Sequence, residues 1–94
     1  MNEVLLHLIH RYNLRMETVT GNIEDVVYFN PDNGYSVLAL NVNGEPLTVV
    51  GTFPELAVGE EVEVSGEYAH HPRFGQQLKA QSFRRILPLS LIHI

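Results

Sequence analysis

Apolar and polar side chains alternate along much of the chain from residue 17 to residue 86, the pattern of β-strands that bury one face. β-Branched and aromatic residues, which favour strands, are concentrated in the same region. The pattern predicts strands at residues 17–29, 35–42, 47–53, 61–68 and 76–86. In the fourth strand it directs Val62, Val64 and Tyr68 toward the core, and in the fifth it sets Leu78, Ala80 and Ile86 on the face opposite Lys79, Phe83 and Arg85.

Turn-forming residues separate these strands. Asn30-Pro31-Asp32-Asn33-Gly34 is the strongest turn signal, because proline presets one backbone angle and Asn-Gly tolerates the left-handed region. Asn43-Gly44 predicts a second tight turn, and Pro54, which has no N–H, ends the third strand. Residues 54–59 are too few for more than a turn, and residues 70–75 are predicted to form a loop.

A helical pattern precedes the strands, since Leu5, Leu8, Ile9 and Tyr12 follow the i, i+3, i+4, i+7 spacing of one helix face. The predicted fold class is therefore all-β: a small five-stranded OB-type Greek-key barrel with a short N-terminal helix. An SH3-like barrel is the nearest alternative.

Composition limits the chain to one small soluble domain. It has 94 residues, 45% of them hydrophobic and 18% charged, which is typical of a folded globular protein. No apolar run approaches the roughly 18 residues that span a bilayer, so no membrane contact is expected. The absence of cysteine and of a signal peptide favours a cytoplasmic location.

Charge is distributed unevenly. The formal net charge is -5, which argues against nucleic-acid binding. However, residues 17–67 contain no lysine or arginine and hold every acidic residue except Glu3, while all charged residues after Glu67 are basic. Any contact with a phosphate backbone is therefore expected in the basic strip that follows Glu67.

Four sequence blocks carry a resemblance to a known family: VYFNPDNGYSVL at 27–38, TVVG at 48–51, GEEVEVSGEY at 59–68 and HPRFGQQL at 71–78. In this order they resemble the N-terminal OB domain of bacterial RecD-like ATP-dependent DNA helicases, over residues 16–88. Residues 1–15 lie outside the resemblance, and we expect an upstream extension or a misassigned start there. Residues 89–94 are expected to be a truncated or non-native tail.

The resemblance implies a non-catalytic helicase module that contributes to single-stranded DNA contact or to positioning of the motor domains. The implied partners are single-stranded DNA and those motor domains. ATP and Mg²⁺ are implied cofactors of the full-length helicase, which we call the parent, and not of this chain. The sequence contains no G-x-x-x-x-G-K-[ST] motif, so we expect no ATPase or helicase activity from the chain alone. The alternative is an interaction scaffold that packs on its own helicase motor without contacting DNA.

The candidate nucleic-acid-binding residues combine positive charge with aromatic rings, as single strands require. An alternative stays open, in which the two phenylalanines of the strip, Phe74 and Phe83, are core residues and the cations form a solvated face. Tyr35 is the aromatic residue of the first turn most expected to be exposed. The candidates are Arg73, Phe74, Lys79, Arg84, Arg85 and Tyr35.

Metal and catalytic sites are not expected. Glu3, His7 and His10 share one side of the predicted helix, but a zinc site needs three or four converging ligands. His70 and His71 are adjacent on a strand and so point to opposite faces. No serine lies beside a plausible base, which leaves no nucleophile motif.

Overall fold

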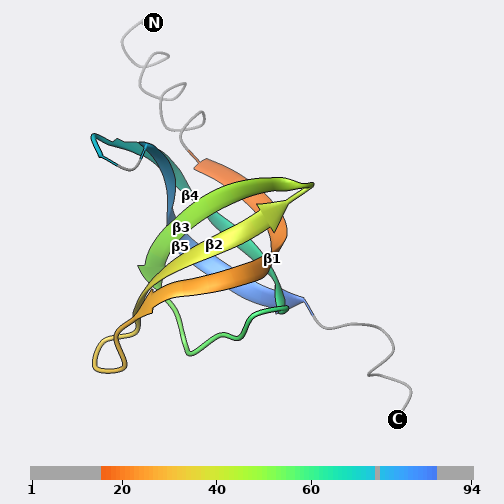
Figure 1. Cartoon of the computed structure of the whole chain (residues 1–94), viewed down its shortest axis with the longest axis vertical. Coiled ribbons are helices and arrows are strands. Elements are labelled where there is room, and N and C mark those ends of the chain that lie inside the picture. Colours follow the sequence, from red (N-terminus) through yellow and green to blue (C-terminus); the bar gives the residue numbers. More distant parts are fainter. Residues whose placement is uncertain (1–15, 74, 87–94) are drawn as a thin grey trace, which may run out of the picture.

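A computed structural model of the chain describes residues 16–73 and 75–86. This part of the chain consists of five β-strands and their connections (Figure 1). The predicted N-terminal helix lies outside the described residues. The strands are β1 (Met16–Phe29), β2 (Tyr35–Val42), β3 (Glu45–Thr52), β4 (Glu61–His71) and β5 (Gly75–Ile86).

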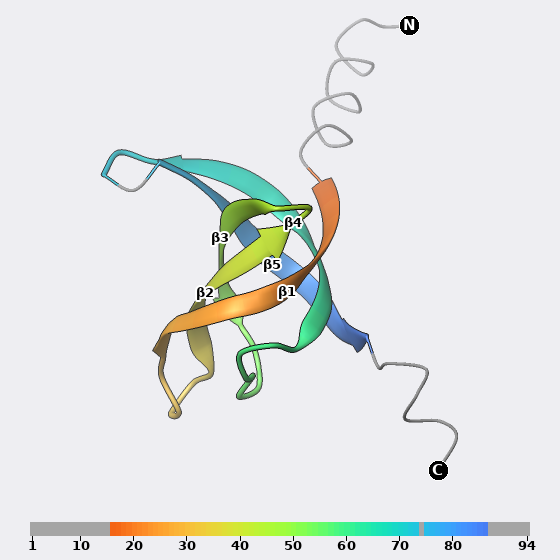
Figure 2. The same cartoon turned by 45° about the vertical axis from the view of Figure 1, so that its right-hand side comes forward.

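The strands close into a barrel in the order β1-β2-β3-β5-β4. Long β1 serves two neighbours: residues 16–22 pair with β4, and residues 22–29 pair with β2. Irregularities at Ile23/Asp25 and Val26/Tyr28 allow β1 to bend around the barrel, as Figure 2 shows. A short parallel pairing of Thr48–Val50 with Gln77–Lys79 closes the barrel. The predicted all-β, five-stranded Greek-key barrel is confirmed.

Inward-facing residues of every strand form one core, and the 53–60 connector covers the end of the barrel. Phe53 and Leu56 from this connector are buried, although the connector contains no helix. The peptide N–H of Gly59 donates to the Ile23 carbonyl, and that of Ile23 donates to the Glu60 carbonyl, which ties the connector to β1. The buried core residues are Ile23, Leu38, Leu40, Val49, Phe53, Leu56, Val62, Val64 and Leu78.

A β-bulge in β5 corrects one prediction. Ser82 lies opposite Ser65 but Ala80 lies opposite Gly66, so Gln81 is an extra residue in the pairing with β4. One inserted residue exchanges the two faces beyond it. As a result Phe83, not Ile86, faces the core side beyond the bulge, opposite buried Val64.

The connection between β4 and β5 is shorter than predicted, because β4 continues to His71 and β5 begins at Gly75. The two strands project past the barrel as a hairpin, which is visible at the upper left of Figure 1. Tyr68 is 39% exposed, although its strand parity matches that of Val64 and it lies opposite buried Leu78. The other predicted turns, at residues 30–34 and 43–44, are confirmed. Asn43 and Gly44 both have positive φ, as a two-residue hairpin turn requires.

Candidate nucleic-acid interface

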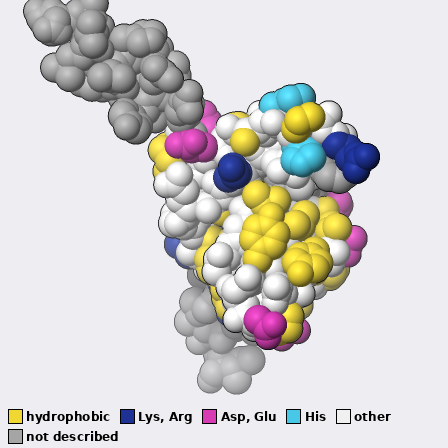
Figure 3. All heavy atoms as spheres, turned by 90° about the vertical axis from the view of Figure 1, so that its left-hand side faces the viewer, with side chains coloured by type: hydrophobic (Ala, Val, Ile, Leu, Met, Phe, Trp, Pro, Cys, Tyr) yellow, Lys and Arg dark blue, Asp and Glu magenta, His cyan; other side chains and the backbone are white. Residues whose placement is uncertain are grey.

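The outward side of β1 and β2 carries exposed hydrophobic residues, and we call this surface, together with the adjoining parts of β3 and β5, the aromatic face. Val27, Tyr28 and Tyr35 are 59%, 50% and 41% exposed. The rings of Tyr28 and Tyr35 lie 6.3 Å apart with a tilt of 55°. Figure 3 shows this side of the molecule, where hydrophobic side chains gather below histidine, lysine and arginine side chains. Isolated exposed apolar residues are ordinary, but a clustered patch indicates a binding surface.

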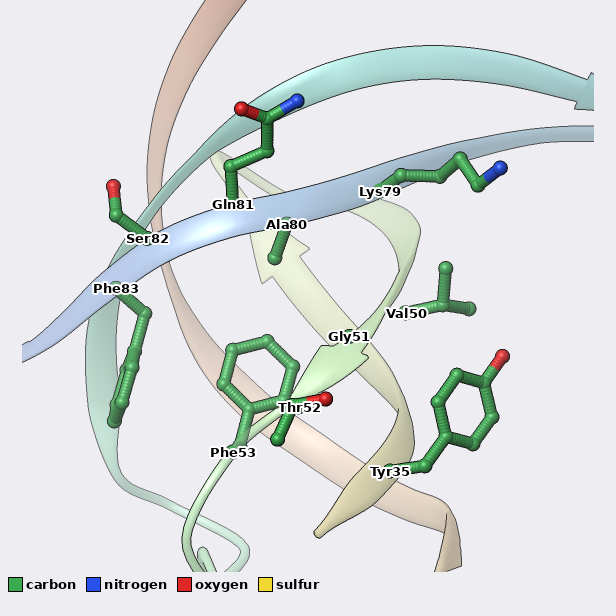
Figure 4. Close-up of a pocket in the computed structure, with 10 residues that line it drawn as sticks. All are labelled: Tyr35, Val50, Gly51, Thr52, Phe53, Lys79, Ala80, Gln81, Ser82 and Phe83. Atoms are coloured by element: carbon green, nitrogen blue, oxygen red, sulfur yellow. The ribbon is translucent and has the colours of Figure 1, made fainter. Parts of the chain in front are cut away.

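One hollow of the aromatic face lies where β3 and β5 diverge after their short parallel pairing, and we call it the Phe53 hollow. Its volume is about 590 Å³, and it lies between Phe53 and Phe83 at one end and Tyr35 at the other. The rings of Phe53 and Phe83 meet edge to face at 5.1 Å. Gly51 and Thr52 lie between the rings of Phe53 and Tyr35 (Figure 4).

A second hollow of about 420 Å³, which we call the Val27 hollow, adjoins the first. Val27, Val37 and Thr48 line it together with His71 and Gln77 from the β4–β5 hairpin. Tyr35 and Val50 line both hollows. The two hollows are therefore adjacent, and Tyr35 and Val50 form their shared boundary.

The structure separates the predicted basic strip into two groups. Lys79 lines the Phe53 hollow together with Tyr35, and within the described residues it has no ion pair. Arg73 lies in the turn between β4 and β5, where its peptide N–H donates to Nδ1 of His71. The side chain of Phe74 lies outside the described residues.

Arg84 and Arg85 instead face carboxylates. Nε of Arg84 donates to Oε1 of Glu63 at 2.7 Å, and Nε of Arg85 donates to Oε1 of Glu60 at 2.8 Å. Arg85 also donates from its terminal nitrogen to the Glu55 carbonyl at 2.9 Å. Neither arginine lines the two hollows of the aromatic face.

Glu60 joins this second group to the connector. Its Oε2 accepts the Ala57 peptide N–H at 2.8 Å while its Oε1 accepts from Arg85. The hydrogen bond from Ala57, followed by the interaction with Arg85, holds the pKa of Glu60 below its ordinary value of 4.5 against the opposing effect of desolvation. The pair Glu60–Arg85 thus anchors the connector to the end of β5.

Several residues of the aromatic face were not among the predicted candidates, namely Val27, Val37, Thr48, Val50, Phe53 and Gln77. Strand alternation places Val37 on the outward side of β2 beside Tyr35, which was a usable signal. The meeting of β3 with β5 gave no signal in the sequence, because a parallel pairing between strands 3 and 5 depends on the closed topology.

The described residues include no helix long and apolar enough to cross a membrane. Within the same part of the chain, no group of three or more histidine or carboxylate side chains is arranged to hold a metal ion.

Solved structures with similar folds are OB-fold proteins. A chain of the S. pombe Stn1–Ten1 complex has a TM-score of 0.63 and 23% identity, covering 81% of this chain and 61% of that one. A chain of a Replication Protein A heterotrimer bound to ssDNA has a TM-score of 0.64 and 9% identity, covering 84% and 63%. This chain thus spans less than two thirds of either relative.

The N-terminal domain of PriB from Thermoanaerobacter tencongensis, a dimeric structure, has a TM-score of 0.62 and 13% identity, covering 80% of this chain and 99% of that one. Similarity at these identities establishes the fold. A family model described as the OB-fold domain of the ATP-dependent DNA helicase YrrC matches residues 16–88. The predicted resemblance is confirmed, and this chain belongs to the family of OB-fold domains of the ATP-dependent DNA helicase YrrC.

Proposed function

We propose that this chain is the non-catalytic N-terminal module of a bacterial RecD-like DNA helicase and that its aromatic face contacts single-stranded DNA. The observation that carries the proposal is that Tyr35 and Lys79 line the same open hollow. A ring on which a base stacks, next to a cation that reaches a phosphate, is the combination that single-strand binding needs. The Replication Protein A relative, which is bound to ssDNA, supports the same function for the fold.

Each predicted site residue has a place in this proposal. Tyr35 provides the stacking surface, Lys79 neutralises a phosphate, and Arg73 extends the positive charge along the β4–β5 hairpin. Phe74 lies outside the described residues and stays a predicted stacking residue. Arg84 and Arg85 stabilise the barrel, because both direct their guanidinium groups at carboxylates of the chain itself.

The chemistry of unwinding belongs to the parent in this proposal. ATP and Mg²⁺ are bound by its motor domains, and this module positions the single strand that those domains move along. The module needs no cofactor of its own.

Two substitutions on the same strand test the proposal, since Lys79→Gln and Arg84→Gln each remove one positive charge from β5. We would titrate a fluorescein-labelled oligothymidine with the full chain at low salt and follow its anisotropy. Lys79→Gln should weaken binding several-fold, because the cation that it removes lines the Phe53 hollow of the aromatic face. Arg84→Gln should leave the affinity close to that of the unsubstituted chain, because the Arg84 cation faces Glu63.

Equal losses in the two variants would mean that charge acts at long range and not at the Phe53 hollow. A larger loss for Arg84→Gln would place the DNA on the other basic group. No binding by a folded chain, as judged by circular dichroism, would contradict DNA contact and favour the scaffold that packs on its own motor.

A further inference from the structure

We infer that the aromatic face holds two successive bases of a single strand, one in each hollow, with the ring of Tyr35 inserted between them. The inference rests on the proposed function and specifies its footprint. It makes Tyr35 a wedge between neighbouring bases and not a platform for a single base.

The shared wall of the two hollows is the first support. Tyr35 and Val50 line both the Phe53 hollow and the Val27 hollow. Tyr35 is exposed enough to contact ligands on either side. The ring of Tyr28 lies beside that of Tyr35, with the two centroids 6.3 Å apart. Side chains that insert between base steps are a known way for proteins to hold unstacked nucleotides.

The shape of the Phe53 hollow is the second support. Its end is an edge-to-face pair of phenylalanines, and Gly51 and the short side chain of Thr52 lie between Phe53 and Tyr35 (Figure 4). A Cβ at Gly51 would lie only 3.1 Å from the Cβ of Ala80, so this stretch of β3 lies close against β5 beneath the opening. The hollow therefore has aromatic rings at both ends, Phe83 with buried Phe53 at one and Tyr35 at the other, which suits one planar base.

The polar groups around the hollows are the third support. Thr52, Gln81 and Ser82 line the Phe53 hollow, and Thr48 and Gln77 line the Val27 hollow. Hydroxyl and amide groups both donate and accept hydrogen bonds, so they can meet the edge of any base. Two bases on opposite sides of one ring are about 7 Å apart, twice the ~3.4 Å rise of a stacked strand, which an extended single strand can span.

The test compares thymidine 5′-monophosphate with the dinucleotide pTpT on the full chain, by following backbone amide shifts in NMR titrations. Gly51 reports on the Phe53 hollow and Thr48 on the Val27 hollow. We expect the dinucleotide to bind about ten-fold more tightly, the gain that a second stacked base provides. The two amides should then follow one common binding curve.

Tyr35→Leu keeps an apolar side chain but removes the wedge, and it should abolish the advantage of the dinucleotide. Tyr68→Leu is the matched control, because Tyr68 has a similar exposure of 39% against 41% but lines neither hollow. An equal dinucleotide advantage in both variants would overturn the inference, and so would a response from only one of the two amides.

Failure of the inference can be separated from failure of the proposed function. If a labelled oligothymidine binds but the dinucleotide shows no advantage over the mononucleotide, the two-base footprint is wrong and DNA contact stands. If the oligothymidine does not bind at all, the proposed function itself is contradicted.

Discussion

Gly66 is the glycine at which the barrel leaves least space for a side chain. It lies opposite Ala80 beside the bulge in β5, and a Cβ there would collide with the Lys79 carbonyl and approach the Ala80 Cα at 2.9 Å. The atoms in the way are backbone atoms, which cannot rotate aside as the end of a side chain can. The tight contact between β4 and β5 therefore requires glycine at this position.

We expect Gly66→Ala to lower the free energy of unfolding by about 1–3 kcal/mol, the usual cost of forcing an extra methyl group into a packed site. Urea unfolding followed by circular dichroism measures it. Ser82→Ala, next to the same bulge but exposed, should change the free energy of unfolding by no more than about 0.5 kcal/mol. An equally small change for Gly66→Ala would show that the two strands separate easily.

The bulge at Gln81 explains why strand alternation predicted the first half of β5 and failed on the second. Alternation correctly placed Leu78 in the core, but it put Phe83 on the wrong face, because the extra residue Gln81 interrupts the period. The bulge depends on the pairing between β4 and β5, and no local pattern in the sequence predicts it. The dihedral preferences of Asn43-Gly44, in contrast, are local, and that turn was predicted correctly.

Among the elements, the connector between β3 and β4 depends most on side-chain contacts outside the strands. It contains no helix, yet it must hold Phe53 and Leu56 over the open end of the barrel. Arg85 reaches it twice, through the carboxylate of Glu60 and the carbonyl of Glu55. Arg84, one residue earlier, forms a single contact with Glu63 on the neighbouring strand.

Replacing each arginine by methionine should therefore have unequal effects. Arg85→Met should cost about 1 kcal/mol of unfolding free energy, because it removes a partly exposed ion pair and one further hydrogen bond. Arg84→Met should cost less than about 0.5 kcal/mol, because the Arg84 side chain is 67% exposed and its pair is screened by water. Thermal unfolding of the two variants in one buffer is the measurement, and equal losses would contradict the anchoring role of Arg85.

The same contact makes the connector sensitive to acid. The pKa of Glu60 is lower in the folded chain than its ordinary value of 4.5, so the folded state favours the carboxylate. Its contribution to stability is complete above the ordinary pKa and is lost as the pH falls through the folded pKa. Glu60→Gln should therefore lower the melting temperature at neutral pH. The difference in melting temperature from the unsubstituted chain should become smaller below about pH 4.5.

Glu61→Gln controls for the loss of one negative charge, since Glu61 has no hydrogen bond or ion pair from its side chain within the described residues. A melting-temperature difference for Glu60→Gln that persists unchanged into acid would mean that the glutamine disturbs the connector by its shape. The pH dependence would then have another origin.

At the scale of the whole molecule, the negative net charge opposes the proposed binding of DNA. The chain carries a formal net charge of -5, and its acidic residues other than Glu3 all lie within residues 17–67, from which most of β1 to β4 is built. The charge pattern predicted that any contact with a phosphate backbone would lie in the basic strip after Glu67. The structure leaves only part of the strip available, because Arg84 and Arg85 face Glu63 and Glu60. That division could not be predicted from residue spacing, since the partner carboxylates lie on a different strand.

A weak dependence of DNA binding on salt follows from this charge distribution. If Lys79 and Arg73 neutralise one phosphate each, the slope of log K against log[salt] is about -1.4, from about -0.7 for each phosphate on a single strand. Base stacking, which is insensitive to salt, then supplies most of the affinity. Anisotropy titrations of the full chain with oligothymidine over a range of KCl concentrations measure the slope. A slope of about -3 or steeper would require at least four neutralised phosphates, and hence contacts from cations other than Lys79 and Arg73. A shallow slope that is unchanged in Arg84→Gln but approaches about -0.7 in Lys79→Gln would identify Lys79 as one of the two phosphate contacts.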